Sequence, residues 1–176
     1  VECDPILDSL IGWSASDAEA WRPVATETLS VVRDHLPGFQ TLTIRASLVE
    51  KAGASPVIEL ASAIGLFTEY LAGLLEAGFD GPWLAANTEF RFAVGSGYFQ
   101  EIAKLRAARV LIANVLKGFG LSGHWPRLHV ETTSVNKTLY DPFNNLLRAT
   151  TESMAAAIGG ADSISTSAFD QGFREP

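Results

Sequence analysis

The stretch RLHVETTSVNKTLYDPFNNLLRAT, residues 127–150, predicts a strand, a loop and a helix in succession. Its first residues alternate between two faces, with His129, Glu131 and Thr133 on one and Leu128, Val130 and Thr132 on the other, as in an extended segment. Asp141 is placed to cap the helix, Pro142 to occupy its first turn, and Gly159-Gly160 to end it. The apolar stripe of this helix would be Leu146, Leu147, Thr150, Met154 and Ala157.

The rest of the chain repeats this alternation of strand and helix. Helices are predicted over 20–35, from Ser55-Pro56 to about residue 77, and over 98–118, and a capping box at Ser16 and Glu19 starts the first of them. Strands are predicted over 39–46, 90–94 and 163–168, with a loop over 50–54. Regular alternation with helices of this length indicates βα units on a parallel sheet, in one domain spanning residues 1–176.

Composition narrows the class of protein. The formal net charge of −7 and the pI of about 4.9 argue against nucleic acid or an anionic membrane as the main partner. Cys3 is the only cysteine, so neither an intrachain disulfide nor a cysteine-based zinc site is expected. No signal-peptide pattern is visible, and the most apolar helix contains Glu59 and Glu69, which favours a packed helix over a membrane span. We therefore expect a cytoplasmic protein.

The segment HVETTSVNKTLYDPFNNLLRATTESMAAAIGGADSISTSAFD, residues 129–170, resembles the late barrel segment of the methylmalonyl-CoA mutase family. Residues 51–80 and 99–116 are similar to earlier helices of the same barrel. The form N-K-T-x-Y-D-P is closer to the family's non-catalytic small subunit than to its catalytic large subunit. The resemblance implies the second half of a (β/α)8 barrel and a family that depends on adenosylcobalamin.

This sequence departs from the family pattern at five places, and in the family these five places bind the substrate and the cofactor. The family's S-G-Y-H tract, its substrate-binding lysine, its R-L-S stretch, the aromatic of its S-G-W tract and its H-T-N-x-F-D-E tract are all changed. In the same order, this sequence has Arg45–Leu48, Gly38, Asn87–Glu89, Val135, and Ser165–Ser167 with Gln171. The cobalamin-binding D-x-H-x-x-G motif does not occur. The resemblance therefore implies a chain without catalytic, cofactor-binding or metal-binding residues, with adenosylcobalamin held by the catalytic subunit.

The length of the chain leads to a prediction about partners. A whole (β/α)8 barrel needs roughly 200 residues or more, and the chain has 176. A partial (half) barrel, α/β in class, would expose apolar inner strand faces and two sheet edges, which need a cover. The cover could be the mutase large subunit, a missing N-terminal half-barrel or a second copy. The leading hypothesis is a small-subunit-like chain with a structural role, in an assembly that interconverts methylmalonyl-CoA and succinyl-CoA.

Two other functions stay open. One is a binding module for another small ligand, with a pocket at the carboxyl ends of the strands formed by Arg45, Ser47, Glu131, Asn136 and Tyr140. The other is a diverged mutase active on a related acyl-CoA.

Three smaller motifs have competing interpretations. His129 and Glu131 share a strand face and could form a metal or acid–base pair, or simply a hydrogen-bonded pair. The Gly95–Gly97 turn could hold a phosphate at a helix N-terminus, but a plain tight turn is favoured. Lys104, Arg106 and Arg109 favour a solvated or ion-paired helix face over a nucleic-acid patch.

Overall fold

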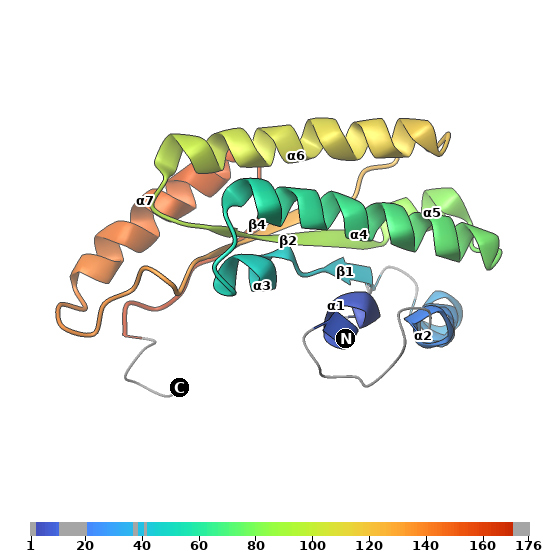
Figure 1. Cartoon of the computed structure of the whole chain (residues 1–176), viewed down its shortest axis with the longest axis horizontal. Coiled ribbons are helices and arrows are strands. Elements are labelled where there is room, and N and C mark those ends of the chain that lie inside the picture. Colours follow the sequence, from blue (N-terminus) through green and yellow to red (C-terminus); the bar gives the residue numbers. More distant parts are fainter. Residues whose placement is uncertain (1–2, 11–20, 37–38, 41, 171–176) are drawn as a thin grey trace. The chain divides into compact units, whose positions relative to one another are not determined.

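The computed structural model describes residues 3–10, 21–36, 39–40 and 42–170. It contains a four-stranded parallel sheet of order β1-β2-β3-β4, with strands that alternate with helices along the chain (Figure 1). The strands are β1 Leu42–Ile44, β2 Thr88–Val94, β3 Arg127–Thr132 and β4 Ser163–Ser165. The helices are α1 Pro5–Leu10, α2 Trp21–His35, α3 Ala46–Lys51, α4 Pro56–Glu76, α5 Gly81–Ala86, α6 Tyr98–Gly118 and α7 Asn144–Gly159. The predicted fold class, parallel βα units consistent with a partial barrel, is confirmed.

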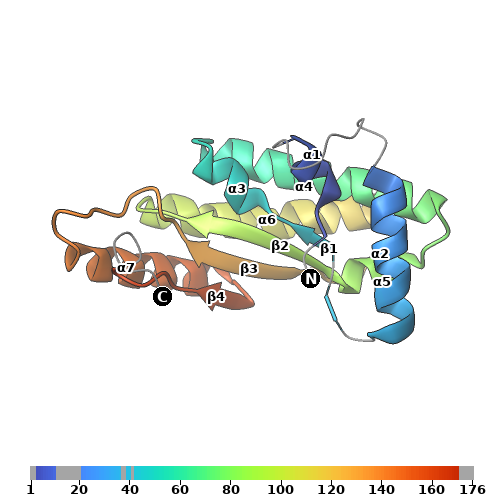
Figure 2. The same ribbon diagram turned by 90° about the horizontal axis from the view of Figure 1, so that it is seen from below.

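The chain forms two compact units that interleave in sequence. The first unit comprises residues 1–45, 63–90 and 112–127, and the second comprises residues 46–62, 91–111 and 128–176. In the first unit β1 pairs with β2 through Leu42↔Thr88 and Ile44↔Phe90, and Cys3 adds a parallel bridge to Leu42. In the second unit β3 pairs with β4 through His129↔Ser163 and Glu131↔Ser165, and the two strands lie side by side (Figure 2).

Aromatic packing forms the core of the first unit. Phe67 and Tyr70 of α4 are fully buried. The Phe67 ring meets Phe90 edge-on with centroids 5.1 Å apart, and Trp21 meets Tyr70 in the same way at 5.0 Å. Gly73 lies so close to Trp21 that an added Cβ would come within 2.6 Å of its indole. The last turns of α4 therefore belong to a tightly packed interior.

Helix α4 is also long and apolar enough to cross a membrane, judged by length and composition alone. Phe67, Tyr70 and Leu71, however, are buried in the core described above, and Glu59 is fully buried in an ion pair, whereas Val57 and Ile58 at the start of the helix are exposed. These contacts agree with the prediction of a packed helix.

In the second unit, α6 and α7 approach each other closely. A Cβ added at Gly159 would lie 2.7 Å from Leu105 Cδ1, so only glycine fits there without a shift. The buried face of α7 accordingly consists of small or polar residues: Asn145, Ala149, Glu152, Ala155, Ala156 and Gly159. The predicted apolar stripe of α7 is instead mostly exposed, with Leu147 at 68% and Met154 at 50%. The stripe lies away from the packed face of α7, because close helix approach selects small side chains for that face.

The expectation of apolar inner strand faces is also wrong for β3 and β4. Leu128 and Val130 are fully buried on one face. The opposite face, which would line a closed barrel, carries polar residues that are half-buried or exposed: His129, Glu131, Ser163 and Ser165. In β4 all three residues are exposed.

Several predicted boundaries shift for local reasons. The strand predicted over 39–46 ends at Ile44, because the Arg45 N–H donates to Asp4 Oδ2 at 2.8 Å, and α3 then begins. Helix α3 occupies the start of the predicted 50–54 loop, and α5 was not predicted. The strand predicted over 163–168 ends at Ser165, since the Ser167 N–H donates to Thr132 Oγ1.

The predicted cap of α7 is wrong as well. Asp141 accepts a hydrogen bond from the Asn144 side chain at 2.7 Å, and the helix itself begins only at Asn144, without a side-chain cap. The predicted end is confirmed, since Gly160 adopts the left-handed conformation with φ 91°. Helix α6 begins and ends where predicted, whereas the capping box at Ser16 and Glu19 lies outside the described residues.

Candidate functional site

A group of polar side chains in the second unit lies at the carboxyl ends of β2 and β3. In parallel α/β folds such strand ends are the usual position of a functional site, because the loops that follow them converge there. We call the group at this edge the polar rim. Its members are Glu50, Lys51, Ser96, Glu131, Thr133, Asn136, Lys137 and Glu152.

A buried carboxylate organises one half of the polar rim. Glu152 of α7 is almost completely buried. It accepts hydrogen bonds from Asn136 Nδ2 at 2.7 Å and from Lys137 Nζ at 2.6 Å. The Asn136 amide also donates to Ser96 Oγ at 2.7 Å. The loops after β2 and β3 are thereby joined to the interior face of α7.

Helix α3 organises the other half. Glu50 accepts a hydrogen bond from Thr133 Oγ1 at 2.9 Å, and Lys51 Nζ lies 3.3 Å from Glu131 Oε1. The Thr133 backbone N–H donates to Val94 O at 2.9 Å and so continues the pairing beyond the regular strands. Lys51 therefore neutralises Glu131 and Lys137 neutralises Glu152, whereas Glu50 is bound by an uncharged hydroxyl group.

The first unit contains a separate buried cluster around Arg45. Its guanidinium forms ion pairs with Asp4 and Asp8, and Tyr70 donates from its hydroxyl to Asp4 Oδ1 at 2.7 Å. Burial raises the pKa of the Asp4 carboxyl and, with help from the Asp4 charge, that of the Tyr70 hydroxyl. Burial also raises the pKa of the Cys3 thiol to about 11, so this thiol is a poor nucleophile at neutral pH.

The five residues of the predicted pocket are spread over different environments. Arg45 belongs to the first unit, in the cluster with Asp4. Ser47 is buried in α3, Glu131 pairs with Lys51, and Asn136 pairs with Glu152, all within the second unit. Tyr140 is fully exposed on the loop before α7. Only Glu131 and Asn136 lie in the polar rim, and they use different partners there.

The smaller motifs can be placed too. His129 Nδ1 lies 2.8 Å from Ser163 Oγ, while Glu131 turns to Lys51. Ser96 of the Gly95–Gly97 turn is engaged by Asn136. Arg109 pairs with Asp162 at 2.8 Å, and Lys104 is buried in an ion pair, so the predicted ion-paired helix face is present at both residues.

Sequence reasoning missed five members of the polar rim: Glu50, Lys51, Thr133, Lys137 and Glu152. Glu152 did carry a signal, because it shares helical spacing with Ala149, Ala155, Ala156 and Gly159, a face made otherwise of small residues. A lone carboxylate on such a face predicts a buried polar contact.

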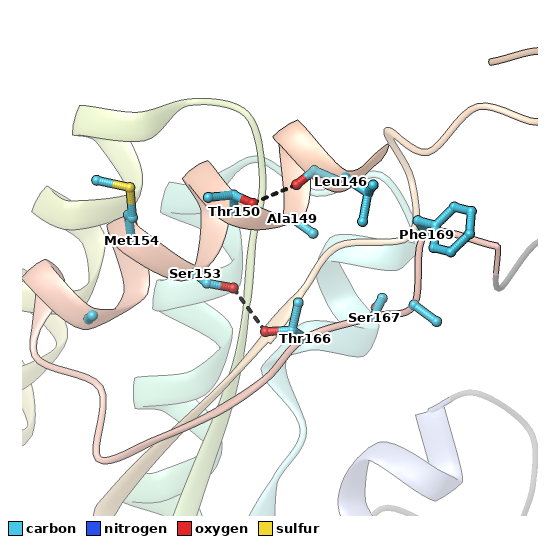
Figure 3. Close-up of a pocket in the computed structure, with 10 residues that line it drawn as sticks. Leu146, Ala149, Thr150, Ser153, Met154, Thr166, Ser167 and Phe169 are labelled. Carbon is cyan, nitrogen blue, oxygen red and sulfur yellow. Dashed lines mark hydrogen bonds between the residues drawn. The ribbon is translucent and has the colours of Figure 1, made fainter. Parts of the chain in front are cut away.

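A groove of about 600 Å³ runs beside α7 in the second unit (Figure 3). Its walls come from the exposed side of α7 and from the segment 166–169 after β4. Met154 and Phe169 make it largely apolar, and its hydroxyl groups are engaged, since Ser153 Oγ lies 2.9 Å from Thr166 Oγ1 and Thr150 donates to Leu146 O. The groove is thus suited to apolar contact.

Adenosylcobalamin is the cofactor of the family that the sequence resembles. Across the described ranges, no group of three or more His, Cys, Asp or Glu residues is arranged to hold a metal ion. The carboxylates of the polar rim are already engaged by Lys51, Thr133, Asn136 and Lys137. These carboxylates are thus bound by other side chains of the same unit.

Comparison with known proteins identifies the family. The family model for methylmalonyl-CoA mutase matches residues 13–176. The methylmalonyl-CoA mutase small subunit of Porphyromonas gingivalis is 37% identical over 99% of this chain and 28% of its own length. The large subunit of the same organism is 34% identical over 87% of this chain and 22% of its own length. The Escherichia coli methylmalonyl-CoA mutase is 34% identical over 81% of this chain and 20% of its own length.

The chain therefore spans only 20–28% of the length of these relatives. Within that span the family model covers nearly every residue. The chain belongs to the methylmalonyl-CoA mutase family.

Proposed function

We propose that this chain is part of a small subunit of methylmalonyl-CoA mutase, and that its role is structural. In this role it supports a catalytic large subunit and contributes no reacting group. The observation that carries the proposal is the 37% identity to a small subunit over 99% of the chain. The assembly would interconvert methylmalonyl-CoA and succinyl-CoA, with adenosylcobalamin in the large subunit supplying the radical chemistry.

The state of the polar rim supports a non-catalytic role. Its carboxylates form short contacts with ammonium, amide and hydroxyl groups of the same unit, for example Glu152 with Lys137 at 2.6 Å. A general acid or base must instead be able to reach a substrate proton. These pairs are better suited to fixing the loops than to proton transfer.

The exposed side of α7 supports an interface role. Leu146, Leu147 and Met154 are each about half exposed or more, and Phe143, which precedes the helix, is 69% exposed. Clustered apolar side chains of this kind mark protein contact surfaces. Next to them β4, the outermost strand in the sheet order, exposes all three of its residues. A partner that covers this side would bury both the apolar residues and the sheet edge.

Reconstitution tests the proposal. The chain is co-expressed with a methylmalonyl-CoA mutase large subunit, and the complex is measured by size-exclusion chromatography and by conversion of methylmalonyl-CoA with added adenosylcobalamin. We expect the two chains to comigrate and turnover to require the large subunit. Turnover by the chain alone would contradict the structural role. Separate migration of the two chains would contradict the proposal that this chain binds the large subunit.

A ligand screen distinguishes the binding-module alternative. Acyl-CoAs and other small molecules are added to the chain alone, and the melting temperature is followed. The structural role predicts no shift with acyl-CoAs, whereas saturable stabilisation by any ligand would favour a binding module.

A further inference from the structure

Ala93, in the carboxyl-terminal half of β2, has both of its backbone groups bound by side chains. Its N–H donates to Glu59 Oε1 at 2.8 Å, and its C=O accepts from Lys104 Nζ at 2.6 Å. Strand β1 pairs with β2 only as far as Phe90. Glu59 of α4 and Lys104 of α6 thus provide at Ala93 the donor and acceptor that a neighbouring strand would otherwise provide.

The two side chains form a buried ion pair. Lys104 Nζ lies 2.6 Å from Glu59 Oε2 and 2.6 Å from Glu101 Oε2, and the Glu59 and Lys104 side chains are 0% and 3% exposed. Buried ion pairs of this kind are weak evidence for stability alone, since desolvation offsets much of the Coulomb attraction. Their geometry, however, fixes the atoms to which they bind.

The Ala93 backbone atoms bound by this pair are followed in the sequence by residues that contact the polar rim. Val94 follows Ala93 and accepts from the Thr133 N–H at 2.9 Å. Two residues later, Ser96 Oγ accepts from Asn136 at 2.7 Å. A Cβ added at Gly95 would lie 3.7 Å from Glu101 Oε1, so the Glu101 carboxylate lies beside this turn.

We propose that Glu59 and Lys104 are positioning residues that replace a missing strand neighbour at Ala93 and thereby hold the β2 side of the polar rim in place. Both act on the polar rim through the Ala93 backbone to which they bind. This role does not depend on the proposed small-subunit function, because it concerns only contacts within the second unit.

The pair gives this role a dependence on pH. Burial raises the pKa of Glu59 from 4.5 to about 7, against the opposing influence of Lys104 and the Ala93 N–H, while Glu101 raises it slightly. The charged groups that act on Glu59 are thus Lys104 and Glu101, both from α6. A local opening of the structure around Ala93 that exposes Glu59 to water restores the ordinary pKa of its carboxyl. The equilibrium constant for this opening is therefore smallest below pH 4.5 and increases as the pH rises through 7.

A groove of the second unit lies beside Lys104. Lys104 contributes to the wall of a groove of about 250 Å³, together with Val57, Leu60 and Gln100. Val57, which also lines this groove, is 71% exposed. A local opening at Ala93 can thus hydrate the pair without unfolding of the whole unit.

Hydrogen exchange of the 176-residue chain tests the proposal. Exchange of the Ala93–Ser96 amides is measured by mass spectrometry from pH 5 to pH 8 and corrected for the intrinsic pH dependence of exchange. We expect the opening constant to rise on the order of 100-fold over this range in the wild type. In Glu59→Gln, which cannot titrate, the corrected profile should be flat.

The matched control is Glu69→Gln, which removes a half-exposed carboxylate from the same helix. It should retain the wild-type profile. A flat wild-type profile, or a Glu59→Gln profile as steep as that of the wild type, would overturn the proposal. If Glu59→Gln does not fold, carboxyl NMR of the wild-type chain decides: a Glu59 midpoint near 7 that coincides with the exchange midpoint supports the role, and an ordinary midpoint near 4.5 contradicts it.

Discussion

Helices α4 and α7 both carry an apolar stripe at helical spacing, yet they use it in opposite ways. Helix α4 turns Phe67, Tyr70 and Leu71 into a core where none of them is exposed. Helix α7 buries small and polar residues and leaves Leu147 at 68% exposure and Met154 at 50%. Hydrophobic periodicity thus identifies a helix, but it does not say whether the partner of the apolar face lies within the same chain.

The largest expected effect comes from truncating the core side of α4. Phe67→Ala removes a fully buried ring that packs edge-on against Phe90. It should lower the free energy of unfolding by about 3–5 kcal/mol in urea titrations. The matched change on α7, Leu147→Ala, should alter it by less than about 0.5 kcal/mol. Equal losses in the two variants would mean that α7 packs its apolar stripe after all.

A second variant tests the polar contact on the buried face of α7. Lys137→Met removes the ammonium that binds the buried Glu152 carboxylate at 2.6 Å. Since a hydrogen bond to a buried charged group is lost, the free energy of unfolding should fall by about 2 kcal/mol. Lys117→Met, at an exposed position near the end of α6, serves as control and should be near neutral. A neutral Lys137→Met would show that Glu152 is satisfied without it.

Two glycine substitutions compare the helices at the level of the backbone. Gly160 ends α7 with φ 91°, so Gly160→Ala should destabilise the chain by about 1 kcal/mol. Gly65 lies inside α4 with no atom within 4 Å of an added Cβ. Gly65→Ala should therefore raise the free energy of unfolding of the chain by roughly 0.5 kcal/mol. Thermal unfolding of both variants would show the opposite signs; a shift of the same sign would contradict this assignment.

The substitution with the smallest expected effect on stability should have the largest effect on binding of the large subunit. Leu147→Glu places a charge on the exposed side of α7 and should change the free energy of unfolding by less than about 0.5 kcal/mol. If the large subunit covers this side, binding should weaken at least roughly 10-fold in a titration calorimetry experiment. Val31→Glu, a 52% exposed position on α2, provides the control. Unchanged binding of Leu147→Glu would place the interface elsewhere.

Much of the fold could be predicted because its signals are local. Helix α6 and helix α4 lie where their apolar spacing and the Ser55-Pro56 start predicted them, and strand–helix alternation predicted the parallel sheet. The buried face of α7 could not be predicted in this way. Its packing depends on the approach of Gly159 to Leu105, a contact between helices more than fifty residues apart in sequence.

The polar rim shows the same limit. Glu131 and Asn136 were predicted as site residues because they lie near the carboxyl end of a strand, but their partners Lys51 and Glu152 lie on helices elsewhere in the sequence. The role of Asp141 was misjudged for a related reason. Its side chain is satisfied by Asn144 before the helix begins, so the helix starts without the expected cap.

The contact of Gly159 with Leu105 also constrains how this chain can diverge. A methyl group added at position 159 would occupy space that the Leu105 side chain already fills, at 2.7 Å from its Cδ1. A relative with alanine at 159 should therefore carry a smaller residue at 105, so that the summed volume of the two positions is preserved. The two sites should covary across homologues, whereas the exposed residues of α7, such as Leu147 and Met154, should vary independently of both.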